Sequence, residues 1–313
     1  MLDALAIILE KPEHLSLSRL PLTPPEADDV VVRTTWSGIS TGTERLLYSG
    51  RMPAFPGMGY PLVPGYESVG IIEDAGASTS LKVGQHVFVP GARCFGPVRG
   101  LFGGAASRLV AKAARVVPIA DEFADQSILM ALAATAYHAR VGVMPGGGDL
   151  IIGHGVLGRL LARLAVQAGG EPPTVWERNP ARADGAQNYN VIAPEDDPRR
   201  NYKTIFDVSG DGNILDELIS RLAPGGEIVL AGFYDTLTFT FPPAFMREAR
   251  LRVAAEFKDG DLLAVKQLVE SHSLSLDGLI THRQPASNAA AAYKTAFNDP
   301  SCLKMVIDWS LSA

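Results

Sequence analysis

A short glycine-rich segment near the middle of the chain, Gly-His-Gly-Val-Leu-Gly at residues 153–158, constrains the fold more than any other feature. It follows residues 149–152, an aspartate and three apolar residues typical of a short strand, and opens residues 156–168, where apolar side chains recur at helical spacing. The first glycine permits a tight turn, the second lets a ligand approach the backbone, and the third lets the helix pack on the strand. In this context the segment predicts a dinucleotide site, with pyrophosphate at the helix N-terminus.

An acidic residue supports this interpretation. Glu177 follows the next predicted strand, residues 174–176, about 20 residues after Gly158. A carboxylate there accepts hydrogen bonds from the ribose hydroxyls and repels a 2′-phosphate, which favours NAD. The neighbouring Arg178 could bind a 2′-phosphate, so NADP stays an alternative cofactor. His154 either hydrogen-bonds the pyrophosphate or lies on the surface beside the loop. The candidate nucleotide-binding residues here are Gly153, His154, Gly155, Val156, Leu157, Gly158, Glu177 and Arg178.

The middle of the chain alternates strands with helices, which indicates a parallel sheet covered on both faces. Further strands are expected at residues 204–208 and 227–231, helices at 126–141 and 213–222, and turns at 145–148 and 224–226. The fold class is therefore α/β with a doubly wound parallel sheet.

The N-terminal and C-terminal regions have other sequence patterns. The N-terminal pattern predicts short strands between Gly/Pro turns, with strands at residues 4–9, 29–36, 69–73 and 85–89 and a long loop at 51–64. After residue 257 we expect helices at 262–270 and 286–297 and strands at 280–281 and 304–309. The predicted domains are 120–256 for the nucleotide-binding part and 1–119 with 257–313 for a β-rich part.

Composition excludes several classes of protein. The net charge of −6 and the pI near 5.6 argue against nucleic-acid binding, which requires a basic face. Two distant cysteines, Cys94 and Cys302, cannot form a four-thiolate zinc site and suit a reducing cytoplasm. No secretory signal and no membrane-spanning run is expected, although contact with a membrane surface stays open.

Three further segments resemble the medium-chain dehydrogenase/reductase superfamily. Residues 38–44 are similar to its G-I-C-G-T-D segment, residues 64–70 to P-G-H-E-x-x-G, and residues 135–139 to T-A-Y-H-A. The resemblance implies a GroES-like catalytic domain, built from both ends of the chain, and a central Rossmann domain. Thr135, Ser209 and Gly232 join the candidate nucleotide-binding residues.

The chain departs from this family at the zinc-ligand positions. They fall on Thr41 (or Ser40), on Tyr66 and near Ala131, and the usual relay histidine is Leu46. Threonine, tyrosine and alanine cannot supply three zinc ligands. We therefore expect no catalytic zinc.

A closer resemblance is to the family of bacteriochlorophyllide a dehydrogenases of photosynthetic bacteria. It covers residues 36–44, 49–53, 55–61, 99–104, 153–158 and 244–250. The resemblance implies oxidation of the 3-(1-hydroxyethyl) group of a chlorin to 3-acetyl in bacteriochlorophyll biosynthesis, with NAD as acceptor. The edge strand near residues 251–256, where superfamily dimers pair, implies a homodimer.

Without zinc, a side chain must help the alcohol lose its proton. Tyr66, at the ligand-histidine position, is the first candidate for general base, provided that its pKa is lowered or its proton is coupled to a neighbour. Glu67 would tune it, Thr43 would bind the substrate hydroxyl, and His138 is the alternative base. The structural alternatives are a packed aromatic, an acid paired with an arginine, a turn hydroxyl and a core histidine.

The chlorin substrate that the resemblance implies is wide, flat and mostly apolar. Its propionate carboxylate can form an ion pair with an arginine. The candidate substrate residues are Arg51, Phe55, Met58, Tyr60, Arg99 and Phe102. Simple loop packing is the alternative for the apolar ones. Two other functions stay open: a zinc-free quinone or enone reductase that uses NADPH, and a non-catalytic protein that binds a nucleotide or pigment. The sequence leaves the preferred chlorin open.

Overall fold

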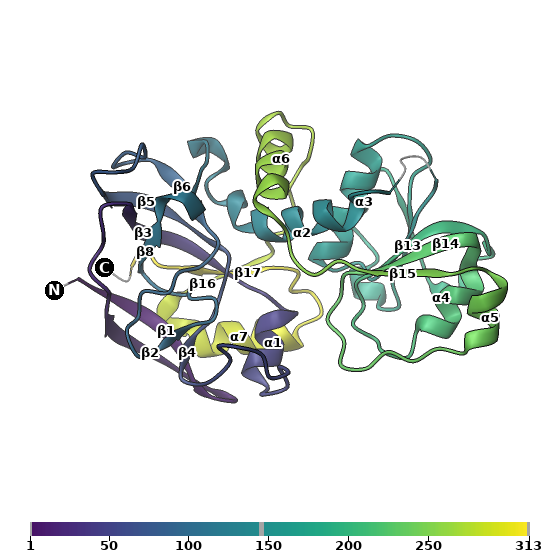
Figure 1. The fold of residues 1–313 in the computed structure, drawn as a ribbon, viewed down its shortest axis with the longest axis horizontal. Coiled ribbons are helices and arrows are strands. Elements are labelled where there is room, and N and C mark those ends of the chain that lie inside the picture. The colour runs from purple at the N-terminus through teal and green to yellow at the C-terminus, as the bar shows by residue number, and fades with distance from the viewer. Residues whose placement is uncertain (1, 144–146, 312–313) are drawn as a thin grey trace. The chain divides into compact units, whose positions relative to one another are not determined.

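The computed structural model describes residues 2–143 and 147–311, so part of the turn expected at 145–148 lies outside the described residues. The chain divides into two compact units (Figure 1). The first unit ends at Ala131 and resumes at Asp277, and the second runs from Leu132 to Leu276. The expected domain boundaries, 119/120 and 256/257, fall earlier in the chain and stay a prediction.

The described residues of the first unit form two sheets. A seven-stranded sheet has the order β16-β17-β3-β5-β6-β9, with β8 also paired to β3, and a four-stranded sheet has the order β2-β1-β4-β7. The strands are β1 (Asp3–Lys11), β2 (His14–Pro21), β3 (Asp29–Ile39), β4 (Leu62–Val63), β5 (Ser68–Ala75), β6 (His86–Val89), β7 (Arg99–Gly100), β8 (Arg108–Lys112), β9 (Val117–Pro118), β16 (His282–Pro285) and β17 (Met305–Asp308). The helices are α1 (Thr43–Tyr48) and α7 (Ala289–Asn298).

Both ends of the chain build this unit together. β17 pairs antiparallel with β3, so that Met305 lies opposite Ile39 and Asp308 opposite Trp36. One hydrophobic core contains side chains of β1, β3 and α7, among them Ile7, Val31 and Tyr293. Residues more than 200 positions apart, such as Lys304 and Glu67, therefore meet in one unit.

The described residues of the second unit form a six-stranded sheet in the order β12-β11-β10-β13-β14-β15, in which every pair is parallel. The strands are β10 (Leu150–Ile152), β11 (Thr174–Trp176), β12 (Asn190–Ile192), β13 (Tyr202–Asp207), β14 (Leu222–Leu230) and β15 (Arg250–Val253). The helices are α2 (Met130–Arg140), α3 (Val156–Gln167), α4 (Leu215–Arg221), α5 (Phe241–Met246) and α6 (Asp259–Glu270). The chain order reverses between β10 and β13, as expected for a doubly wound sheet.

Several local predictions differ from the structure. The helix expected over 126–141 begins with a 3₁₀ turn, Gln126–Leu129, before α2. The turn expected at 224–226 is an irregularity within β14, where Gly225 has φ of 72°. The strand expected at 280–281 lies slightly later in the chain, as β16. It pairs with β17, and the pairing runs from His282 opposite Met305 to Pro285 opposite Asp308. Over the described residues, no helix is both long enough and apolar enough to cross a membrane.

Candidate functional site

The glycine-rich loop connects β10 to α3 at the reversal point of the sheet. Gly153 has φ of 99°, in the left-handed region that glycine adopts without strain, and Gly155 caps α3. A Cβ on Gly158 would overlap the Gly153 carbonyl oxygen, whereas a Cβ on Gly155 would meet no atom within 4 Å. The loop thus packs tightly at its third glycine and leaves open space at its second, as a cradle for a pyrophosphate requires.

Glu177 lies directly beside this loop. Its Oε2 accepts a hydrogen bond from the His154 backbone N–H at 3.0 Å, and its Oε1 accepts one from the Asn179 N–H at 2.7 Å. Each carboxylate oxygen has a second lone pair, so the half-buried side chain retains capacity for ribose hydroxyls. Arg178 is 66% exposed, and its guanidinium lies 3.7 Å from the Glu217 carboxylate.

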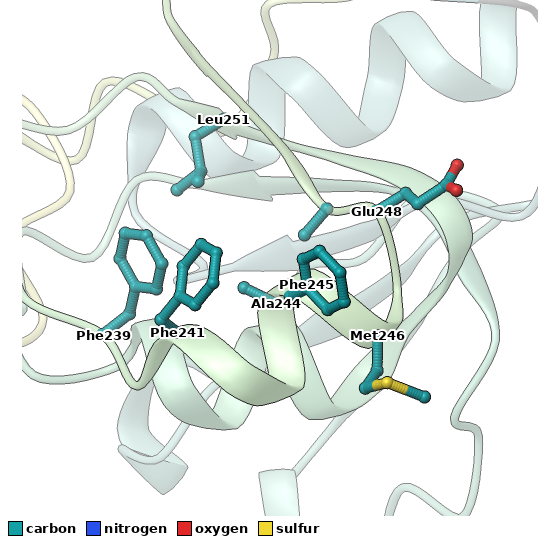
Figure 2. Close-up of a pocket in the computed structure, with 8 residues that line it drawn as sticks. Phe239, Phe241, Ala244, Phe245, Met246, Glu248 and Leu251 are labelled. Carbon is teal, nitrogen blue, oxygen red and sulfur yellow. The ribbon is translucent and has the colours of Figure 1, made fainter.

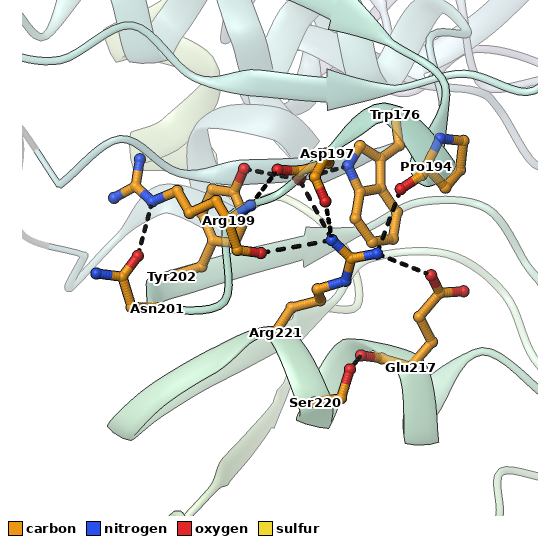
Figure 3. Close-up of polar contacts among 9 residues, drawn as sticks. All are labelled: Trp176, Pro194, Asp197, Arg199, Asn201, Tyr202, Glu217, Ser220 and Arg221. Atoms are coloured by element: carbon orange, nitrogen blue, oxygen red, sulfur yellow. Dashed lines mark hydrogen bonds and ion pairs between the residues drawn. The ribbon is translucent and has the colours of Figure 1, made fainter.

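A buried polar cluster supports the end of β11, just before Glu177 (Figure 3). The Trp176 indole N–H donates to Asp197 Oδ2 at 2.8 Å, and the Tyr202 hydroxyl donates to the same oxygen at 2.9 Å. The Arg221 guanidinium lies 4.6 Å from the Trp176 ring centroid and donates to the carbonyls of Asp197 and Pro194. This packing holds the end of β11 in place and thereby positions Glu177, the next residue.

His154 is fully buried, so its interpretation as a surface histidine is wrong. Its Nδ1 lies 2.6 Å from the Arg182 carbonyl oxygen and its Nε2 2.8 Å from the Tyr189 hydroxyl. Burial lowers the pKa of His154 to about 4, so the ring is neutral at physiological pH. Because both ring nitrogens have partners within the chain, the predicted ring contact with a pyrophosphate is not available in this arrangement.

Ser209 and Gly232 converge on Asp207, at the carboxyl end of β13. The Ser209 N–H donates to Asp207 Oδ1 at 2.9 Å, and the Gly232 N–H donates to the Asp207 carbonyl oxygen at 3.1 Å. Asp207 lies opposite Ile152 of β10, immediately before the glycine-rich loop. Thr135 is half-buried on α2.

Asp207 was not predicted, although an acid at the end of an apolar strand was a usable signal. Its Oδ2 is buried without a hydrogen-bond partner, and burial raises the pKa of the side chain. A polar atom of this kind at the carboxyl edge of the sheet suits a place beside a bound nucleotide.

Three hydroxyl groups meet in the first unit. The Tyr66 and Ser40 hydroxyl oxygens are 2.7 Å apart, the Thr43 hydroxyl also bonds to Tyr66, and the Phe102 ring contacts the Tyr66 ring edge-on at 5.6 Å. Burial and the nearby Glu67 charge raise the pKa of Tyr66. The first condition for Tyr66 as a base, a lowered pKa, is therefore not met, and coupling to a neighbour remains.

Glu67 forms a fully buried ion pair with Lys304, whose side chain is 1% exposed. The structural alternative for Glu67 named an arginine as partner, and the partner is a lysine. Burial raises the pKa of Glu67 and the Lys304 charge opposes that shift. Gly38 leaves the room for this pair, since a Cβ there would overlap both side chains.

A second buried carboxylate, Glu44, was not predicted. Its oxygens accept hydrogen bonds from the Ser40 N–H at 2.9 Å and the Tyr293 hydroxyl at 2.7 Å. Burial raises the pKa of Glu44 to about 7. Tyr293 is 249 residues away in sequence, so no local pattern indicated the contact.

The candidate substrate residues separate into three groups. Met58 and Tyr60 pack against the cluster of Leu47 and Leu62, which supports the simple packing alternative for them. Phe55 and Phe102 are exposed at 40% and 36%. Arg99 donates to the Tyr60 carbonyl at 3.4 Å, and Arg51 donates to Ser49 Oγ at 3.2 Å.

His138 belongs to the second unit. Its Nδ1 lies 2.8 Å from Asp261 Oδ2, and its side chain is 20% exposed. It is thus held by an acid of α6 within that unit.

Comparisons with known proteins agree with both units. The alcohol dehydrogenase GroES-like domain family matches residues 26–121. Proteins named 2-desacetyl-2-hydroxyethyl bacteriochlorophyllide A dehydrogenase, from Rhodobacter capsulatus and Cereibacter sphaeroides, are each 55% identical, over 98% of this chain and 99% of theirs.

Solved structures share the fold at low identity. A short chain alcohol dehydrogenase from Escherichia coli, complexed with NADH, matches with a TM-score of 0.84 and 22% identity, over 98% of this chain and 99% of that one. A putative zinc-binding dehydrogenase from Sinorhizobium meliloti, bound to NADP, matches with a TM-score of 0.81 and 18% identity, over 98% and 100%. These likenesses confirm the predicted fold class, a GroES-like region joined to a Rossmann sheet. By its close relatives, the chain belongs to the bacteriochlorophyllide a dehydrogenase family of the medium-chain dehydrogenase/reductase superfamily.

Proposed function

We propose that this chain oxidises the 3-(1-hydroxyethyl) side chain of a bacteriochlorophyllide to 3-acetyl in bacteriochlorophyll biosynthesis, with NAD as hydride acceptor and without zinc. The observation that carries the proposal is 55% identity, over 98% of the chain, to two dehydrogenases named for the hydroxyethyl bacteriochlorophyllide. The chain is an oxidoreductase that acts on a CH–OH group, and NAD, zinc independence and the residue roles are the proposed refinements.

NAD is favoured over NADP by the surroundings of Glu177. Its carboxylate stands beside the glycine-rich loop, where it would accept ribose hydroxyls and repel a 2′-phosphate. Arg178, which would favour NADP, lies close to Glu217 instead. The nucleotide would contact the backbone of residues 153–158, with Thr135, Ser209 and Gly232 as further contacts.

The hydroxyl groups of Ser40, Thr43 and Tyr66 take the place of the metal. Neutral hydroxyl groups are poor zinc ligands, so this donor set does not suit the ion. When bound beside residues 153–158, NAD would supply the hydride acceptor. Tyr66 would take up the proton of the substrate alcohol while it passes its own proton to Ser40, because its raised pKa disfavours a free phenolate. Ser40 would release its own hydroxyl proton to water, so that each hydroxyl group ends with one proton. Positive charge at the carbinol carbon spreads into the macrocycle, so general-base help of about 10²–10⁴-fold suffices.

The remaining candidates have subordinate roles. Glu67, paired with Lys304, tunes Tyr66 through the charge that it places beside the phenol. Thr43 forms a hydrogen bond with the substrate hydroxyl. Phe102, in contact with Tyr66, and the exposed Phe55 would flank the macrocycle. Arg51 or Arg99 would pair with the propionate. His138, held by Asp261, stays the alternative base.

A direct assay tests the reaction. Purified protein, NAD and 3-(1-hydroxyethyl) bacteriochlorophyllide a are mixed in the presence of EDTA. We expect a shift of the long-wavelength absorption of the macrocycle, matched one-to-one by NADH formation. Turnover that EDTA abolishes and zinc restores would contradict zinc independence. The absence of a shift, with NADH binding confirmed separately, would contradict the reaction and favour an enone reductase or a nucleotide- or pigment-binding protein.

We also propose a cytoplasmic homodimer that pairs through β15, the last strand in the order of the second sheet. Beside β15 lies an apolar pocket, shown in Figure 2, lined by Phe239, Phe241, Ala244, Phe245, Met246, Glu248, Ala249 and Leu251. Phe241 and Phe245 are each 65% exposed, and Met246 is 77% exposed. Exposed apolar area of this kind marks an association surface.

Light scattering should give twice the chain mass of 33.3 kDa. A monomer that binds vesicles would favour a peripheral membrane contact instead.

A further inference from the structure

The segment that follows Glu177 is tied to the glycine-rich loop by three buried side chains, His154, Arg159 and Tyr189, which we call the His154 clamp. His154 bonds to the Arg182 carbonyl and to the Tyr189 hydroxyl. The Arg159 guanidinium donates to the carbonyls of His154 at 3.0 Å, Arg182 at 3.1 Å and Asp184 at 2.7 Å. Residues 178–189 are thereby held against the start of α3.

The direction of these hydrogen bonds follows from their partners. A backbone carbonyl only accepts, so His154 Nδ1 must carry the hydrogen that faces the Arg182 carbonyl. A neutral ring has one hydrogen, so Nε2 accepts from the Tyr189 hydroxyl. His154 therefore depends on Tyr189, because without the Tyr189 donor the buried Nε2 has no partner at this contact.

The clamp contacts the residues that are proposed to discriminate between NAD and NADP. The backbone N–H of His154 donates to Glu177 Oε2, so the residue that anchors residues 178–189 also orients the carboxylate. The held segment carries Arg182, and Arg178 at its start lies 3.7 Å from Glu217. A 2′-phosphate pocket would require this backbone to move so that an arginine replaces the carboxylate.

We propose that the His154 clamp determines nucleotide specificity, because it holds residues 178–189 so that Glu177 faces the 2′ position and the arginines do not close on a 2′-phosphate. The inference rests on the proposed use of NAD. It gives His154 a positioning role that differs from both sequence interpretations, a surface histidine and a pyrophosphate ligand.

Two variants loosen the clamp without altering Glu177 or His154. Tyr189→Phe removes one hydroxyl and keeps the ring packing against His154. Gly185→Ala, at φ of 86°, places a Cβ that overlaps the Arg159 guanidinium. Gly169→Ala is the matched control, since Gly169 has a similar φ of 82° and a Cβ there would meet no atom within 4 Å.

The measurement is the ratio of the dissociation constants for NADPH and NADH, from fluorescence titration of each purified full-length variant. This ratio needs no substrate and does not respond to a uniform loss of affinity. We expect both clamp variants to lower the preference for NADH about three- to tenfold, the loss that one or two hydrogen bonds predict. Gly169→Ala should keep the wild-type ratio.

The outcomes separate the two proposals. Wild-type protein that binds NADPH as tightly as NADH would overturn the proposed use of NAD. Wild-type preference for NADH, unchanged in both clamp variants or lowered equally by Gly169→Ala, would overturn the role of the clamp alone. If Gly185→Ala does not fold, the milder Tyr189→Phe decides.

Discussion

Lys304→Met should lower the free energy of unfolding by about 3–5 kcal/mol, the usual result of removing one partner of a buried ion pair. Lys304 is 1% exposed and Glu67 is fully buried, so the carboxylate that remains has no access to water. Its second oxygen, Oε1, already has no hydrogen-bond partner. Chemical denaturation, followed by circular dichroism, measures the loss.

The loss should depend on pH in a defined direction. Without Lys304, the folded-state pKa of Glu67 rises further above its ordinary value of 4.5. Burial already raises the pKa of Glu67 in the wild-type protein, so below that raised pKa both folded proteins hold the proton and the deficit is small. Above it the wild-type side chain releases its proton and the variant side chain retains it, so the deficit grows with rising pH.

Two controls separate the ion pair from a general effect of losing a lysine. Glu67→Gln combined with Lys304→Met removes both charges and should recover most of the stability. Lys266→Met, which breaks a helix-surface pair with Glu270 of 27% and 29% exposure, should cost less than about 1 kcal/mol. Equal losses in Lys304→Met and Lys266→Met, independent of pH, would contradict the buried-charge argument.

The sequence predicted the second unit well because its signals are local. A strand, a tight glycine turn and a helix fall within residues 149–168, and their hydrophobic spacing is sufficient to identify each element. The parallel order of the sheet followed from the alternation of strands and helices. The position of Glu177 followed from the end of the preceding strand, and the structure places it beside the loop.

The contacts that complete the candidate site were beyond such reasoning because they join distant segments. Lys304 reaches Glu67 across 237 residues, and Tyr293 reaches Glu44 across 249. Neither partner carries a local pattern that distinguishes it from an ordinary lysine or tyrosine. Short strands such as β4, only Leu62–Val63, form because β1 lies beside them and have no periodicity of their own.

Tyr66→Phe should reduce kcat by about 10²–10⁴-fold, the range that general acid–base catalysis contributes. The substitution keeps the ring and its edge-on contact with Phe102, and it removes only the hydroxyl that bonds to Ser40. NADH affinity should not change, because the proposed nucleotide contacts lie in the second unit. Steady-state absorption of the macrocycle at saturating substrate measures kcat, and fluorescence titration measures NADH binding.

Tyr48→Phe is the matched control, because Tyr48 packs against Tyr293 and Phe297 in the same unit and has no proposed part in the reaction. It should retain wild-type turnover. If Tyr66→Phe also retained turnover, the proton would have to leave by another route, and His138 would become the next candidate. A loss confined to KM would instead place the Tyr66 hydroxyl in substrate binding. A fall in kcat alone fits the proposed relay, because the loss of an interaction made only in the transition state lowers the rate without changing the affinity for substrate.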